Sequence, residues 1–442
     1  MSGPKRLKGQ PFDSSTIRHQ LVETVDSVVA QGFLTASATA QSAVLTDSGI
    51  TLKIETISNG RLIWGHLRNL GESRLTAVTL DRIGRLPSGN PANPSDLDAV
   101  QRRLLQTGYV EAMANPVLRK VPRMALADGV VRLQDLPSSF LEAAASWSRG
   151  QSTQGYVETR LANLWGTARD LDFGISQGEQ GIRAHAHWKE PWLGSLDARL
   201  DLSGNLAYDS FSQALEGRSD LVWSLLEGRL EVGVGLSAAS RSDRILGDTL
   251  FGPQMSEFGS RTTLAWRRLP PAIWPVGDLL ANLDLEAVRI ESDTGTFARI
   301  RVRTGSEIWP QIGPVDLRFG FQARAIWPLD RTAGLSEAIA PGGIAGWRGW
   351  PEGSPRSPSW GWLVTQAGVG SRERGGVYAF WEPGVRALRT QDQSWVEAWG
   401  WSEGVGMSLV LPTWQIDLVV AGRDDTRTWQ DALLQVRARN RF

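Results

Sequence analysis

Residues 315–325 read VDLRFGFQARA, and apolar and polar side chains alternate along the whole stretch. A period of two places the apolar side chains on one face of a β-strand and the polar side chains on the other. The same alternation recurs in residues 196–202, 230–236 and 298–303, where many of the polar positions are charged. The C-terminal two thirds of the chain are therefore predicted to form long antiparallel strands with one apolar face.

The length and charge of these segments favour strands that cross a membrane. A tilted transmembrane strand needs about 9–11 residues, and charged faces suit the water-filled interior of a closed barrel. All 20 tryptophans except Trp64 lie at Trp147 or beyond, and tryptophan favours membrane–water interfaces. Alternation also fits a soluble β-sandwich, so a tryptophan-rich soluble carbohydrate-binding protein is the alternative from another class.

An all-β antiparallel transmembrane barrel is predicted for residues 137–442. Between Ser139 and Phe442 we expect about sixteen strands, an even number as in bacterial single-chain barrels. The last strand, 434–442, would close the barrel against the first, 139–147. The longest unpatterned connection, Leu329 to Ser359, lies between the eleventh and twelfth strands, and loops of that length are usually functional.

The first 136 residues are predicted to be mixed α and β. Ile17, Leu21, Val25 and Val28 recur at helical spacing. A second helix carries Leu97, Val100 and Leu104 on one face, with Ser95 as its expected N-cap. Gly9-Gln10-Pro11 and Gly89-Asn90-Pro91 precede the two helices, and Gly32-Phe33 and Gly108-Tyr109 close them. This weak repeat predicts two copies of one small module, at 1–60 and 61–136.

The composition and motifs do not favour catalysis or nucleic-acid binding. The net charge is zero and there is no cysteine, so no nucleic-acid partner is predicted. The sequence has neither a Gly-x-Ser-x-Gly elbow nor a Walker loop. Its 4 histidines include His185 and His187 on one strand face, a weak candidate for a metal site. We therefore expect no enzyme, cofactor or metal. No signal-peptide-like apolar stretch follows Met1, so the numbering begins at a processed or truncated end or the chain has no export signal.

The long loop contains Trp347-Arg348-Gly349-Trp350. Here the chain resembles the BamA/TamA superfamily of outer-membrane assembly and translocation barrels, whose sixth extracellular loop carries a hydrophobic-Arg-Gly-aromatic motif folded back into the barrel. The family usually has Val or Ile first and Phe or Tyr last. The resemblance implies that Arg348 pairs with an acid on the barrel wall, while the alternative is a solvated loop arginine.

Other matches occur in the family's order. Phe380-Trp381-Glu382-Pro383-Gly384 resembles its thirteenth-strand motif, in which Phe380, Glu382 and Gly384 would face the loop and Glu382 replaces the usual aspartate. Asn163-Leu164-Trp165-Gly166 resembles an early-strand motif, and Glu403-Gly404-Val405-Gly406 resembles the start of the fourteenth strand. Phe442 matches the C-terminal signal read by the assembly machinery. The N-terminal repeat resembles POTRA modules of the order βααββ, and the first strand of the first module is short or missing.

The resemblance implies a bacterial outer-membrane protein with its N-terminal modules in the periplasm. The preferred function is an assembly or insertion factor, in which the modules dock polypeptide clients or partner subunits and the seam between first and last strands meets client strands and outer-membrane lipid. The alternatives are a two-partner-type secretion translocase and a structural or anchoring barrel of a larger envelope complex. The plug helix usual in translocases is not visible in the sequence.

Overall fold

A computed structural model describes residues 13–442 except 47–48, 59, 149–152, 179–180, 194–195, 197, 211, 227–228, 244–253, 268–279, 294, 329–336, 338–340, 345, 352–356, 372–374, 391–393 and 425–430. The chain divides into two compact units. Unit 1 comprises Met1–Leu136 with Trp165–Thr167, and unit 2 comprises Pro137–Leu164 with Ala168–Phe442.

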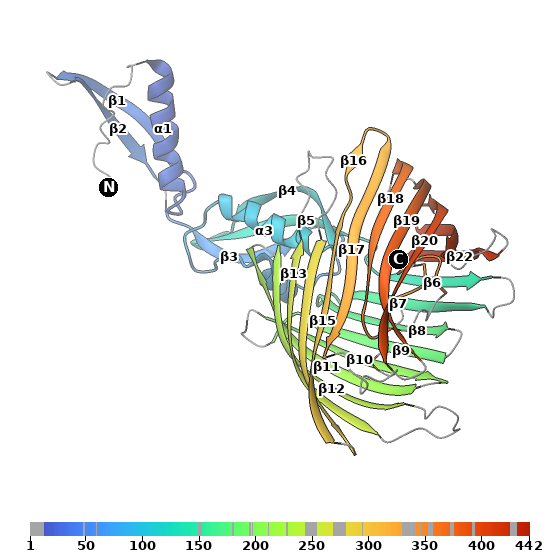
Figure 1. Cartoon of the computed structure of the whole chain (residues 1–442). Helices are drawn as coiled ribbons and strands as arrows, with labels where there is room; N and C mark the ends of the chain where they lie inside the picture. Colours follow the sequence, from blue (N-terminus) through green and yellow to red (C-terminus); the bar gives the residue numbers. More distant parts are fainter. Residues whose placement is uncertain are drawn as a thin grey trace. The chain divides into compact units, whose positions relative to one another are not determined.

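Unit 2 is a closed, antiparallel, 16-strand β-barrel, as the alternation predicted (Figure 1). The two-residue β16 is a small extension between the neighbours β15 and β17. The barrel elements are β6 (Phe140–Trp147), β7 (Gln154–Leu164), β8 (Arg169–Gly178), β9 (Gly181–Glu190), β10 (Arg199–Asp209), β11 (Ser212–Leu225), β12 (Leu230–Asp243), β13 (Met255–Arg267), β14 (Leu280–Ser292), β15 (Gly295–Ile308), β16 (Gln311–Ile312), β17 (Val315–Trp327), β18 (Trp360–Ser371), β19 (Gly375–Arg389), β20 (Trp395–Val410), β21 (Trp414–Arg423) and β22 (Leu433–Arg441).

The alternation of side chains decides which face of each strand is wet. On β17, Phe319 and Phe321 are exposed on the outer face, while Arg324 is buried inside the barrel. Arg299 and Arg301 on β15 are likewise buried inside, and Ile300 between them is exposed outside. An apolar outer face with charged inner positions is the pattern expected of a barrel surrounded by lipid.

The barrel closes by pairing its last strand with its first. β22 pairs antiparallel with β6, from Leu434 opposite Trp147 to Arg441 opposite Phe140. This pairing, called the seam below, joins the segments that the sequence predicted. Closure leaves no free sheet edge, which is what a spanning sheet requires in lipid.

Unit 1 contains a three-stranded sheet with two helices. The element order is β3 (Ile63–Asn69), α2 (Ala77–Gly84), α3 (Ser95–Gln106), β4 (Val110–Lys120) and β5 (Leu126–Asp135). The sheet order is β3-β5-β4, in which β3 is parallel and β4 antiparallel to β5. A core forms between helices and sheet because their apolar faces meet; its fully buried large side chains include Trp64, Leu80, Val100, Leu104 and Leu133.

Two expectations about these helices were wrong or incomplete. The N-cap of α3 is Pro94, with no side-chain cap bond, whereas Ser95 is the first helical residue. Asn93 compensates, because its Oδ1 accepts from the Ser95 N–H at 3.1 Å. Helical periodicity did not indicate α2, which only the βααββ order of the resemblance implied; this helix begins with a Thr76 side-chain cap to the Thr79 N–H.

The N-terminal segment consists of α1 (Ser14–Val29) and a hairpin of β1 (Ser37–Thr46) and β2 (Gly49–Ile57). Asp13 caps α1 by accepting from the Thr16 N–H at 2.7 Å. None of the helix's residues is buried, so its apolar positions do not form a core in this structure. That both N-terminal segments are POTRA modules stays a prediction.

Within the described part of the chain, no α-helix is both long and apolar enough to cross a membrane.

Candidate functional site: the loop between β17 and β18

The structure brings Arg348 and Glu382 together inside the barrel. Arg348 Nε donates to Glu382 Oε1 at 2.7 Å, and Arg348 Nη2 lies 2.6 Å from the same oxygen. The Arg348 backbone N–H donates to Oε2 at 2.9 Å, so the carboxylate binds loop backbone as well as guanidinium. Arg348 is 4% exposed and Glu382 1% exposed. A pair this buried must satisfy its own charges, since either partner alone would be strongly unfavourable.

Glutamine 366 is a further ligand of the loop arginine. Arg348 Nη1 donates to Gln366 Oε1 at 2.8 Å, from the neighbouring strand β18. Sequence reasoning missed Gln366, because nothing in its local sequence separates it from other inward polar positions. Three strands, β18, β19 and β22, thus contribute polar side chains around the loop motif.

Strand alternation on β19 sets up the wall of the site. Phe380, Glu382 and Gly384 point inward, whereas Trp381 between them is 51% exposed on the outer face. The Arg348 guanidinium carbon lies 3.8 Å from the centroid of the Phe380 ring, a cation–π contact that adds to the ion pair. A Cβ at Gly384 would lie 2.8 Å from Trp347 Cη2, so glycine is what lets the loop tryptophan reach the wall.

Two glycines on β20 make room for the aromatic rings that hold Arg348. A Cβ at Gly404 would meet Phe380 Cζ at 2.8 Å, and a Cβ at Gly406 would overlap the Tyr378 ring. The Tyr378 ring centroid lies 5.6 Å from the Arg348 guanidinium carbon. The glycines of the Glu403-Gly404-Val405-Gly406 motif therefore leave space for these two rings. The motif alone did not indicate this role.

The rest of the motif contacts the next strands of the barrel wall, β20 to β22. Gly349 has φ +80°, and a Cβ there would lie 2.9 Å from both Gly422 O and Ser402 Cβ. Its N–H donates to Gln435 Oε1 at 3.4 Å, and Gln435 Nε2 donates to Trp350 O at 3.5 Å. These bonds are long, but Gln435 is fully buried. Because Gln435 belongs to β22, the loop contacts a strand of the seam.

Four tryptophans form an apolar cluster beside the ion pair. Trp347, Trp350, Trp360 and Trp362 are all buried. Trp347 and Trp362 stack with centroids 5.9 Å apart and planes 1° from parallel. Trp347 Nε1 donates to Glu382 O at 3.0 Å, and the Arg386 guanidinium lies 4.1 Å from the Trp350 ring centroid. Burial of these large rings supplies packing energy that the charged pair by itself does not.

The predicted C-terminal residue lies at the end of the seam. Phe442 follows β22, and its N–H donates to Ser139 O at 3.0 Å. Its side chain is 58% exposed. Inside the barrel at the same seam, Arg439 on β22 pairs with Glu142 on β6.

No metal-binding arrangement is found in the described part of the chain, where no group of three or more histidines, cysteines or carboxylates is placed to hold an ion. His187 Nδ1 lies 3.3 Å from Asp172 Oδ2 on the adjacent strand. One further loop residue, Glu337, is buried inside the barrel and was not indicated by any sequence motif.

Three solved structures share this architecture over nearly the whole chain. BamA from Haemophilus ducreyi lacking POTRA domains 1–3 is 12% identical with a TM-score of 0.61, and the match covers 99% of this chain and 95% of that one. CdiB from Escherichia coli is 14% identical with a TM-score of 0.60, over 98% and 85% of the two chains. CdiB from Acinetobacter baumannii is 12% identical with a TM-score of 0.57, over 99% and 88%. No family model and no curated protein matches the sequence. At such identities the likeness establishes the fold alone: this chain is a 16-strand closed barrel of the kind seen in BamA and CdiB.

Proposed function

We propose that this chain is a bacterial outer-membrane factor that assembles or inserts other polypeptides. The observation that carries the proposal is the loop motif, which is fastened inside a closed barrel by Arg348 and Glu382 and contacts the seam strand β22 through Gln435. A loop held in this way links the interior of the barrel to the place where its first and last strands meet. A closed barrel with a loop that contacts the seam suits a protein whose activity takes place where its own first and last strands meet.

The N-terminal modules would lie in the periplasm and dock clients or partner subunits. The β3-α2-α3-β4-β5 order and the mixed sheet support a POTRA identity for residues 61–136. In the β3-β5-β4 sheet, β4 is an edge strand, and Met113 and Val117 on it are exposed. An edge strand can add an extended segment of another polypeptide through backbone hydrogen bonds, without reading its sequence in detail.

The proposed activity is non-enzymatic. Binding at the sheet edge, strand pairing at the seam and contact with outer-membrane lipid are exchanges of non-covalent interactions, so they need neither a nucleophile nor a cofactor. Many buried charged groups inside the barrel, such as Arg301 and Glu257, form ion pairs with one another, which is the structural role expected of a polar lumen.

A secretion translocase is the second candidate, and the equal likeness to CdiB supports it. A translocase would pass a partner polypeptide through the lumen, which requires the loop to leave its site. A structural barrel of an envelope complex would require neither movement. The three functions therefore differ in which part of the barrel must move.

A disulfide across the seam tests the first candidate directly. Ala143 on β6 lies opposite Ala438 on β22, and the chain has no cysteine of its own. The A143C/A438C pair should block client insertion when oxidised and restore it when reduced. The control pair V157C/I175C joins β7 to β8, away from the seam, and should be inert in both states. Normal insertion by the oxidised seam variant would refute the insertase.

Depletion of the protein, followed by profiling of the outer-membrane proteome, separates the candidates in the cell. A broad loss of β-barrels supports the assembly factor. Loss of one secreted polypeptide supports the translocase, and loss of one envelope complex supports the structural barrel.

A further inference from the structure

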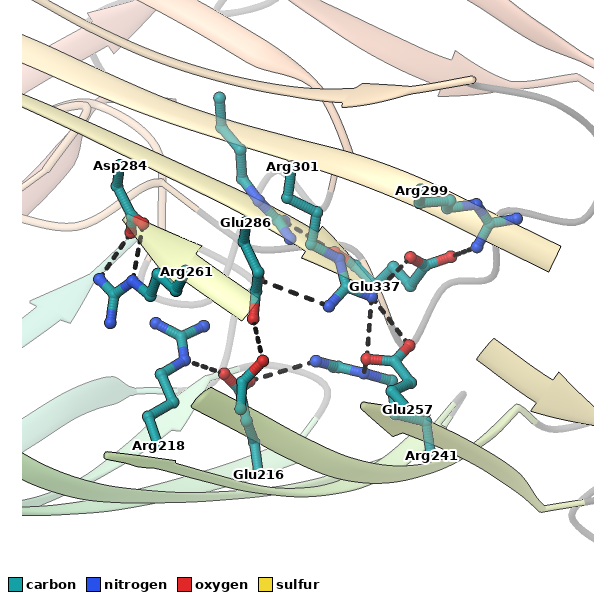
Figure 2. A network of polar contacts seen from close by, with 12 residues as sticks. Glu216, Arg218, Arg241, Glu257, Arg261, Asp284, Glu286, Arg299, Arg301 and Glu337 are labelled. Carbon is teal, nitrogen blue, oxygen red and sulfur yellow. Dashed lines mark hydrogen bonds and ion pairs between the residues drawn. The ribbon is translucent and has the colours of Figure 1, made fainter. Parts of the chain in front are cut away.

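Glu337, in the loop between β17 and β18, lies in a cluster of arginines on the barrel wall (Figure 2). Its Oε1 accepts from Arg301 Nη2 at 2.8 Å, and its Oε2 pairs with Arg299 Nη1. The Glu337 backbone carbonyl accepts from Arg324 Nη1 at 2.7 Å. Glu337 is 2% exposed, so all three contacts are shielded from water.

The arginines are placed by strand alternation on two neighbouring strands. Arg299 and Arg301 are two residues apart on β15 and share its inner face, and Arg324 comes from the adjacent β17. All three are buried. Three guanidinium groups in one small region repel each other, so the site requires nearby carboxylates.

Carboxylates on other strands of the barrel wall neutralise part of this positive charge. Glu257 on β13 accepts from Arg301 Nη2 at 2.8 Å and from Arg241 Nε at 3.0 Å. Glu286 on β14 lies 3.7 Å from Arg301 Nη1. In Figure 2, Glu286 lies on the side of Arg301 away from Arg299, and Glu257 lies below Arg301. The carboxylate that bridges Arg299 and Arg301 comes from the loop.

The loop is therefore fixed at two places by charges of opposite sign. Arg348 binds acids and amides of β18 and β19, and Glu337 binds arginines of β15 and β17. Among the described contacts, the two groups involve different wall residues. Removing a buried counter-charge leaves its partners buried without compensation for their lost hydration. The loop and the wall therefore stabilise each other at both places.

We propose that Glu337 is a second anchor of the loop, and that Arg299, Arg301 and Arg324 form a carboxylate-binding site which it occupies. Glu337 is a positioning residue: it fixes the loop to the wall at position 337, while Arg348 fixes the loop at position 348. The second anchor does not depend on the proposed function, because it concerns where the loop is fixed and not what the barrel transports or inserts.

A double-mutant cycle tests the contact in the full chain. E337Q loses the ion pairs with both Arg299 and Arg301, and R299Q loses the first of them, so each should accelerate unfolding in detergent about tenfold or more, and the double variant should unfold no faster than E337Q alone. Independent effects would instead multiply to about a hundredfold. A multiplicative result would overturn the proposal. E337D retains the carboxylate and should recover part of the loss, which a purely steric role would not predict.

The pair of Glu307 and Arg318 is a matched control. It joins the same two strands, β15 and β17, at 3.0 Å. Whatever change E307Q makes to the unfolding rate should be independent of E337Q. The unfolding rate of the E307Q/E337Q double variant should therefore equal the product of the two single effects. E337Q should also leave the bond after Arg348 as resistant to trypsin as in the unaltered chain, because the first anchor is intact. Rapid cleavage there would show that the loop has only one anchor and would equally overturn the proposal.

Discussion

At the scale of single residues, the Arg348–Glu382 pair makes the clearest prediction. R348E or E382R brings two buried like charges together and should destabilise the barrel by at least about 3 kcal/mol. The R348E/E382R exchange should restore part of this loss. Recovery is incomplete because the Phe380 ring favours a cation at position 348. The temperature at which the barrel loses its folded gel mobility measures the effect, and an exchange variant no more stable than either single variant would contradict the pairing.

Gly349 makes a second prediction at this scale. Its φ of +80° and its close approach to Gly422 O and Ser402 Cβ leave no room for a side chain. G349A should therefore cost about 1–3 kcal/mol for the backbone conformation, and more for the steric overlap. Gly313 has φ +59° and open space around it, so G313A pays the backbone cost alone. Equal melting temperatures for the two variants would mean that the loop can move away from the wall without loss.

At the scale of elements, the ion pair across the seam predicts how easily the seam opens. Arg439 on β22 pairs with Glu142 on β6, whereas Arg437 on the same strand pairs with Asp417 on β21. R439Q should therefore weaken the seam, by about 1–2 kcal/mol for a lost charged hydrogen bond. R437Q should leave it unchanged. In the A143C/A438C background, a brief oxidation should trap less disulfide with R439Q than with R437Q; equal yields would show that the ion pair does not hold the seam.

The elements also show which parts of the structure the sequence could predict. The period of two is a local signal, and the contrast between lipid and lumen makes it strong, so the barrel strands and the position of the long loop follow from it. α2 is only 8 residues long, which is too short for a clear helical period. Glu337 and Gln435 could not be predicted, because their contacts depend on the path of the loop between strands distant in sequence. Glu382 was found only because its neighbours on β19 form a recognisable motif.

At the scale of the whole molecule, each unit has its own source of stability. The core of residues 61–136 is formed by side chains of its own helices and sheet, such as Leu104 and Leu133. The barrel is closed by the pairing of β22 with β6 and braced inside by Arg348 and Glu382. These are different kinds of stabilisation, burial of apolar side chains in one unit and a closed hydrogen-bonded sheet in the other.

This separation predicts two distinct unfolding transitions. L104A opens a cavity in the core of residues 61–136 and should cost that unit about 2–5 kcal/mol, lowering one transition only. R348E should lower only the transition of the barrel. Circular dichroism of the full chain in detergent, monitored at helix and strand wavelengths, distinguishes the two. If L104A lowered the barrel transition to the same extent, the two units would unfold as one cooperative body and would not have separate sources of stability.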